Sequence, residues 1–486
     1  MAQPAEAIAA EPPEGASVAE AAEPTRILRV AMRIAVSMLA NGAQTNDVED
    51  AIGAVARAYG VESVQAAVSF SMVSVSHYAG RATSPTTLLH LVRDRTPDFT
   101  RLSRVSELAR GIRAGSVDIA AAEAALDRID AGRTPYRDAV AFFAPGLSAA
   151  GSTVMFGGTL LDALATLGIG LAIQPILLLL NRSTLQPFFR LAIGAAASAI
   201  LVAALAYLGA QISSGLVLTG SLLRFLPGYA LVSGFRDLID GSIVSGTARL
   251  AEALMLGAAI AGGTALALSL ATAVNVNLSI VTIGLTDWSL PISVTASLLA
   301  IGAYAVQLGV PQQAVAQGAI AGAVAWLLYQ STAGPGETLD KSAATLVATI
   351  LIGAIGRVLA RRVGAPSAIW VVPAILPFLP GLQLVQAMLA ETDTARINGL
   401  LGAAATAFLI GVGVAAGDIV VMLVRGVGRG VRPAVGAVTG GVDVLVIQPV
   451  GRVVAHRLGS SAHAGASAPL EGPADREEAA KRETGP

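Results

Sequence analysis

The chain of 486 residues carries 54% apolar but only 13% charged residues. A soluble globular protein usually carries about 25% charged residues, so the composition excludes a single soluble enzyme and predicts that lipid surrounds most of the chain. There is no cysteine, the four histidines lack metal-ligand spacing, and the formal net charge is −1. We therefore expect no disulfide, no metal or other cofactor, and no nucleic-acid partner.

The N-terminal part of the chain reads as water-soluble. Residues 1–24 hold five glutamates and no basic residue, which is typical of a disordered tail. They lack the apolar segment of a signal peptide, so we expect the N-terminus in the cytoplasm. Residues 25–138 are predicted to form a cytoplasmic α+β domain. Its expected elements are a helix over 26–40, a second from a capping box at Asn46 and Glu49 to Tyr59, strands in 64–78 and 87–92, and helices over 99–113 and 116–130.

Residues 140–424 are almost continuously apolar, with short polar interruptions. Because a bilayer crossing takes about 20 helical residues, we predict ten spans: 140–158, 160–180, 188–210, 215–234, 249–271, 289–309, 312–330, 343–361, 366–389 and 399–424. With a cytoplasmic N-terminus, ten basic residues lie inside and two outside, which favours this count and orientation. Residues 425–486 are predicted to be a cytoplasmic tail, basic at first and then of low complexity, in which an eleventh span stays open.

One eight-residue motif occurs twice in the apolar region. Residues 225–232 read FLPGYALV and residues 378–385 read FLPGLQLV, identical at six positions and 153 residues apart. The copies fall in the fourth and ninth predicted spans, so the region divides into two five-helix repeats, 139–288 and 289–424. Because five is odd, the second repeat is inverted, a plan typical of secondary transporters. The predicted fold is a polytopic all-α membrane protein with an inverted 5+5 repeat.

Each copy of the motif holds a Pro-Gly pair, Pro227-Gly228 and Pro380-Gly381. Proline removes a backbone donor and glycine allows the chain to leave helical geometry, so each pair frees backbone groups that lipid cannot satisfy. A new helix start beyond the pair could hold a carboxylate at its positive end. We predict these four residues as substrate-binding residues. The alternative is that each pair only kinks a packed helix.

Ionisable residues within or beside apolar spans are costly and are candidates for proton coupling or ion pairing. The four candidates are Asp162, Asp237, Arg249 and Glu252. For Asp162 the alternative is a carboxylate that caps the second span. Arg249 and Glu252 lie three apart on one helix, where they could pair with each other, or they are solvated loop charges. Asp418 is of the same kind, with weaker support.

Several short motifs together resemble the threonine/serine exporter family over about residues 26–425. They are Leu39–Ala43 with Val48-Glu49, Phe156–Thr159 with Asp162, Leu226–Gly228, Arg236–Leu238, Arg249–Ala253, Arg361-Arg362 and Leu379–Gly381. The resemblance implies an inner-membrane exporter of small hydrophilic amino acids driven by the proton-motive force. One departure concerns the soluble part, because Val68–Met72 stands where the family pattern usually has Thr-Pro.

The leading hypothesis is therefore export of threonine and serine by proton antiport. The substrate carboxylate would meet the amides at Gly228 or Gly381, its ammonium an acid such as Asp162, and its hydroxyl Gln383 or Gln386. One alternative is an exporter of small carboxylates such as succinate. The other is a membrane-anchored hydrolase with the N-terminal domain as the enzyme, against which the chain has no G-x-S-x-G, H-E-x-x-H or P-loop motif. A gating role for the N-terminal domain and a homo-oligomer stay open.

Overall fold

The structure, a computed structural model of the chain, describes six stretches. They are residues 18–78, 84–93, 95–132, 135–278, 290–333 and 339–430, with side chains from 24 to 424. The described part of residues 1–427 forms one compact unit. Residues 1–17 of the predicted tail and residues 431–486, with their open eleventh span, lie outside the described residues. The first helix begins at Val18, inside the segment predicted as a tail.

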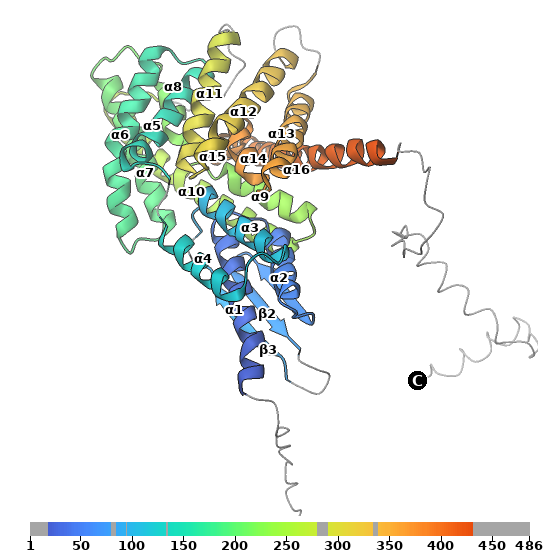
Figure 1. Cartoon of the computed structure of the whole chain (residues 1–486). Helices are drawn as coiled ribbons and strands as arrows, with labels where there is room; N and C mark the ends of the chain where they lie inside the picture. The colour runs from blue at the N-terminus through green and yellow to red at the C-terminus, as the bar shows by residue number, and fades with distance from the viewer. Residues whose placement is uncertain are drawn as a thin grey trace, which may run out of the picture. The chain divides into compact units, whose positions relative to one another are not determined.

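The N-terminal region, residues 18–131, combines helices with one antiparallel sheet (Figure 1). Its elements are α1 (Val18–Ala40), α2 (Thr45–Ala58), β1 (Val64–Ser69), β2 (Met72–His77), β3 (Thr86–Leu91), α3 (Phe99–Arg113) and α4 (Ile119–Ala131). The sheet order is β1-β2-β3, and Val68 lies opposite Val73. Asp98 and Asp118 cap α3 and α4 by accepting from backbone amides, so both helices begin where a carboxylate satisfies their free donors.

The start of the second helix differs from the prediction. The N-cap of α2 is Gln44, without a side-chain capping bond, so the capping box at Asn46 and Glu49 is wrong. Both side chains bind other elements instead. Asn46 Nδ2 donates to the Asp240 carbonyl at 2.8 Å, and Glu49 Oε1 accepts from the Val68 amide at 2.9 Å. Spacing along one helix cannot reveal partners that tertiary packing brings from elsewhere in the chain.

The core of the N-terminal region continues into the helices that follow it. Buried residues of α1, α2, α3 and the sheet belong to one cluster with Ala360, Ile369 and Trp370. The Thr100 hydroxyl donates to the Gly309 carbonyl at 2.6 Å, and the Phe99 amide to the Leu308 carbonyl at 3.1 Å. The first turn of α3 is therefore fixed to the end of a helix more than 200 positions later.

The helices after residue 137 form two series with the same order of long and interrupted elements. The first series is α5 (Asp138–Met155), α6 (Leu160–Arg182), α7 (Pro187–Tyr207), α8 (Ser214–Leu223), α9 (Gly228–Ile239) and α10 (Ile243–Ala273). The second is α11 (Leu290–Gln307), α12 (Gln312–Thr332), α13 (Lys341–Val363), α14 (Ala368–Ala374), η1 (Leu376–Phe378), α15 (Gly381–Leu389) and α16 (Asp393–Gly430). The first helices of the series, α5 and α11, pack together, and Ser148 Oγ donates to the Ala300 carbonyl at 3.0 Å.

Length and composition identify six described helices that could cross a membrane, or up to eight spans when two bent pairs are included. The six are α6, α7, α10, α11, α13 and α16 up to Val424. Ten spans and their inversion stay predictions. Among the predicted ten, α5 and α12 do not meet the criterion. They bury polar side chains, Ser148, Ser152 and Thr153 on α5 and Gln330 on α12, so packing against protein lowers the need for apolar side chains.

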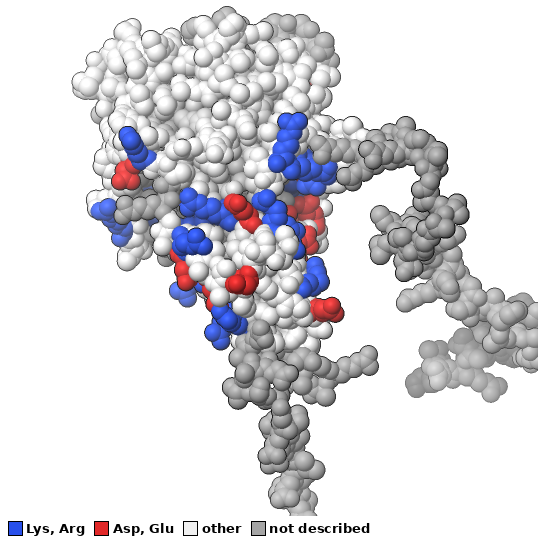
Figure 2. All heavy atoms as spheres, viewed as in Figure 1, with Lys and Arg blue, Asp and Glu red and all other residues white. Residues whose placement is uncertain are grey.

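Exposed side chains divide the surface into an apolar and a charged part. Leu160, Leu179 and Leu266 are 75%, 71% and 61% exposed, as expected where lipid replaces water. On the face in Figure 2, charged side chains gather over the N-terminal region and its junction with the helices, and the far part of the helices is white. The described chain is a polytopic, mostly helical membrane protein.

Candidate functional site

Both predicted Pro-Gly pairs interrupt their helices. In the first series the chain bends by 51° between α8 and α9, and Pro227 is the N-cap of α9. In the second series Pro380 is the N-cap of α15, and a bend of 47° lies a few residues earlier, between Ala374 and Leu376. Proline at these positions needs no backbone donor, because the amides at a helix start have no partner in their own helix.

The two breaks lie against each other. A Cβ added to Gly228 would lie 2.8 Å from Leu379 Cβ and 3.2 Å from the Gly381 nitrogen. A Cβ added to Gly381 would lie 2.7 Å from Leu226 Cβ and 3.1 Å from the Gly228 nitrogen. Real Cβ atoms do not approach neighbours below 3.0 Å, so only glycine permits this contact without movement of the neighbours. The starts of α9 and α15 therefore meet inside the protein with glycine against glycine.

Backbone amides and dipoles give this crossing its chemistry. The first-turn N–H groups of α9 and α15 lack acceptors in their own helices, and each helix start carries partial positive charge. Gly228 and Gly381 are both buried. Such helix starts attract anionic groups such as a carboxylate, but the close contact of the two glycines leaves no room for one between them until the two breaks separate. The two glutamines predicted to bind the substrate hydroxyl are less buried than these glycines: Gln383 is exposed and Gln386 is half-buried.

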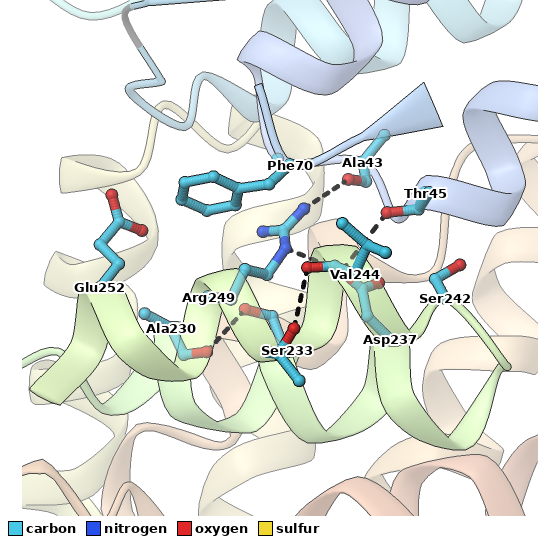
Figure 3. Close-up of polar contacts among 12 residues, drawn as sticks. Ala43, Thr45, Phe70, Ala230, Ser233, Asp237, Ser242, Val244, Arg249 and Glu252 are labelled. Carbon is cyan, nitrogen blue, oxygen red and sulfur yellow. Dashed lines mark hydrogen bonds and ion pairs between the residues drawn. The ribbon is translucent and has the colours of Figure 1, made fainter. Parts of the chain in front are cut away.

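A buried ion pair joins the last turn of α9 to the start of α10, under the N-terminal region (Figure 3). Asp237 Oδ2 lies 2.8 Å from Arg249 Nε, and their side chains are 2% and 10% exposed. The Thr45 hydroxyl donates to Asp237 Oδ2 at 3.4 Å, and Arg249 Nη2 donates to the Ala43 carbonyl at 3.5 Å. The loop after α1 thus contacts Arg249, and the first residue of α2 contacts Asp237.

The predicted pairing of Arg249 with Glu252 is wrong. Arg249 pairs with Asp237, while Glu252 Oε1 lies 2.8 Å from Arg95 Nη2. Arg95 also stacks on Phe70, 3.3 Å from the ring centroid, which is a cation–π contact. Burial lowers the pKa of Arg95, although Glu252 opposes that shift. The Asp237 pair therefore joins α9 to α10, and the Glu252 pair joins α10 to the N-terminal region.

A third ion pair joins α9 to α16. Arg236 Nη2 lies 3.1 Å from Asp418 Oδ2, with side-chain exposures of 15% and 13%. Adjacent residues of α9 thus hold different elements, Arg236 holding α16 and Asp237 holding α10. The sequence pattern supports Asp418 only weakly and does not indicate Arg95 as the partner of Glu252, because neither residue lies at helical spacing from the residue that it pairs with.

Asp162 occupies a capping position at the start of α6. Its Oδ2 accepts from the Thr159 amide at 2.8 Å and hydroxyl at 2.9 Å, while the Thr159 hydroxyl accepts from the Asp162 amide. Its Oδ1 accepts from the Ser213 amide at 2.6 Å. The residue is fully buried. These contacts complete a capping box and match the structural alternative weighed for this residue.

The fold and the crossing define a class: a multi-pass helical membrane protein with paired interrupted helices, as in secondary transporters. A family profile described as "Putative threonine/serine exporter" matches residues 29–271, and a second, described as "Threonine/Serine exporter, ThrE", matches residues 293–424. The chain belongs to the threonine/serine exporter family.

Two curated relatives extend this finding. A "Probable threonine/serine exporter" of Mycobacterium tuberculosis (strain ATCC 25618 / H37Rv) is 28% identical over 416 residues, covering 83% of this chain and 78% of the relative. The "Threonine/serine exporter" of Corynebacterium glutamicum is 27% identical over 408 residues, covering 81% and 82%. No solved structure matches the chain.

Proposed function

We propose that the chain exports threonine and serine across the inner membrane in exchange for protons. The two relatives bear the name of threonine/serine exporters, and the family profiles together cover both helix series. The observation that carries the proposal is the crossing of the two Pro-Gly breaks. It brings two positive helix starts together inside the protein, and they can bind the carboxylate of an amino acid when the two breaks separate during transport.

The reciprocal contacts at the crossing support an inverted repeat. Gly228 faces Leu379, and Gly381 faces Leu226. Residues 226 and 379 occupy the same position of the motif, as do residues 228 and 381. Contacts of residue i with j and of j with i are the sign of a two-fold axis. The two series are then related by an axis through the crossing, and rocking about it gives alternating access.

The orientation follows from the basic residues. Arg236, Arg357 and Arg361 lie beside α2 and α3 of the N-terminal region. The positive-inside rule places that end of the helices, with the N-terminal region, in the cytoplasm. Both termini are then cytoplasmic, and the exporter loads its substrate from the charged side in Figure 2.

Asp237 is the acid best placed to couple proton movement to a change of shape. Protonation of Asp237 removes the partner of Arg249, which contacts the loop between α1 and α2. A buried charge without a partner is strongly unfavourable, so protonation favours an arrangement that exposes Arg249. Asp162 serves this role poorly, because its carboxylate caps the start of α6 and joins it to the start of α8.

Uptake of labelled threonine into inside-out membrane vesicles tests this function. A proton gradient directed out of the vesicle interior should drive accumulation, and an uncoupler should abolish it. Unlabelled serine should compete, and succinate should not. Competition by succinate alone would favour the carboxylate exporter. Threonine uptake at the background rate with and without the gradient would contradict the proposal.

A further inference from the structure

A cavity of about 600 Å³ lies where the N-terminal region meets the helices. Its volume is within the range of ligand pockets, about 300–1,000 Å³. Elements from both parts of the chain line it, α2 and α3 on one side and α9, α13 and α16 on the other. None of the substrate-binding residues predicted from the Pro-Gly motifs belongs to the described lining of this cavity.

Charges of both signs line this cavity. Three aspartates and five arginines belong to its wall: Asp47, Asp50, Asp418, Arg110, Arg113, Arg236, Arg357 and Arg361. The aspartates would repel a ligand that carries only negative charge, and the arginines would repel a ligand that carries only positive charge. A ligand that carries both a carboxylate and an ammonium satisfies both sets.

Three buried polar atoms in the lining residues have no hydrogen-bond partner among the described residues: Ser106 Oγ, Arg357 Nε and Asp418 Oδ1. Buried polar groups normally have partners, so such exceptions point to a missing ligand or solvent molecule. Asp418 is 9% exposed, and its other oxygen holds Arg236. The set comprises a carboxylate acceptor, a guanidinium donor and a hydroxyl.

We propose that this cavity is a cytoplasmic binding site for a small amino acid with a side-chain hydroxyl, which the exporter occupies before transport. Asp418 accepts from the ammonium, Arg357 donates to the carboxylate, and Ser106 bonds the side-chain hydroxyl. The three residues line the cavity, whereas the three atoms are themselves buried, so side-chain rotations accompany binding. The N-terminal region then supplies part of the site, through Ser106 on α3. This inference rests on the proposed function for the identity of the ligand.

Equilibrium binding of labelled threonine to the purified full-length protein in detergent, with no gradient, tests the site. Arg357→Gln should weaken threonine binding about tenfold or more, because it removes a charged donor. Arg104→Gln, on the exposed side of α3, is its control and should bind as the unaltered protein does. Ser106→Ala should weaken threonine binding about two- to tenfold and leave alanine binding unchanged.

Ser37→Ala provides the matched control for Ser106→Ala. The Ser37 hydroxyl is also buried without a described partner, but it lies outside the described cavity lining, so its removal should not change threonine binding. Threonine binding by Arg357→Gln and Ser106→Ala that equals that of their controls overturns the site, as does an unaltered protein that binds no threonine. Vesicle uptake separates the two proposals. If the unaltered protein transports threonine but Arg357→Gln and Ser106→Ala bind it as tightly as the unaltered protein does, the cavity site alone is overturned. If the unaltered protein transports no threonine, the proposed function is overturned.

Discussion

The contact between the two Pro-Gly breaks predicts that alanine is not tolerated at either glycine. Gly228→Ala places a methyl group 2.8 Å from Leu379 Cβ, and Gly381→Ala places one 2.7 Å from Leu226 Cβ. Neither glycine has a positive φ, so alanine fits the backbone and only the neighbour must move. Extra methyl groups in well-packed interiors cost about 1–3 kcal/mol. Each variant should therefore unfold at a lower temperature and transport threonine more slowly.

Thermal unfolding of the purified protein, combined with vesicle uptake, measures both effects. Gly402→Ala and Gly262→Ala are controls, because a Cβ at either position meets nothing within 4 Å. Alanine is preferred over glycine in helices by about 1 kcal/mol, so the controls should be neutral or slightly stabilising. The double variant Gly228→Ala with Gly381→Ala should deviate from additivity by about 0.5–3 kcal/mol, since the two sites touch. Equal stability and flux in the crossing variants and the controls would refute the crossing.

Three further predictions concern the charged residues. Asp237→Asn or Arg249→Gln alone should destabilise the protein by about 3–5 kcal/mol by leaving a buried charge unpaired, and the double variant should recover much of this in thermal unfolding; equal loss in the double variant would contradict the pair. Asp162→Ala should lower stability by about 1 kcal/mol or more through loss of the cap but leave the pH dependence of threonine flux unchanged; a lost pH dependence would make Asp162 a proton carrier. Asp47 is exposed on α2, but desolvation by the protein around it raises its pKa, with Arg236 opposing and Asp240, Asp50 and Asp418 adding to the shift. The folded state thus holds this proton to higher pH than the unfolded state, so stability falls as pH rises through the raised pKa, and Asp47→Asn should flatten that slope in unfolding measured between about pH 4 and 7.

The sequence predicted the interruptions because their cause is local. Proline and glycine alter the backbone where they stand, so the repeated motif was enough to place breaks at Pro227 and Pro380. The strands found at 64–69, 72–77 and 86–91 and the helix over 99–113 also follow patterns within short windows. That the two breaks touch depends on the packing of segments 153 residues apart, which the motif does not encode by itself.

The partners of the charged residues were harder to predict for the same physical reason. Arg249 and Glu252 have helical spacing, yet their partners are Asp237, on another helix, and Arg95, in the N-terminal region. The orphaned polar atoms of the junction cavity come from three distant helices. Only the burial and mutual position of these residues distinguish a binding surface from solvated loop charges.

Coupled movement of protons and threonine tests the central claim most directly. The purified protein is reconstituted into proteoliposomes that contain a pH-sensitive dye, and threonine is added to one side without an imposed gradient. Downhill movement of threonine into the vesicles should drive protons out, and the interior pH should rise. The Asp237→Asn with Arg249→Gln double variant should lose this pH change. Threonine entry without any change in interior pH would contradict proton-coupled export.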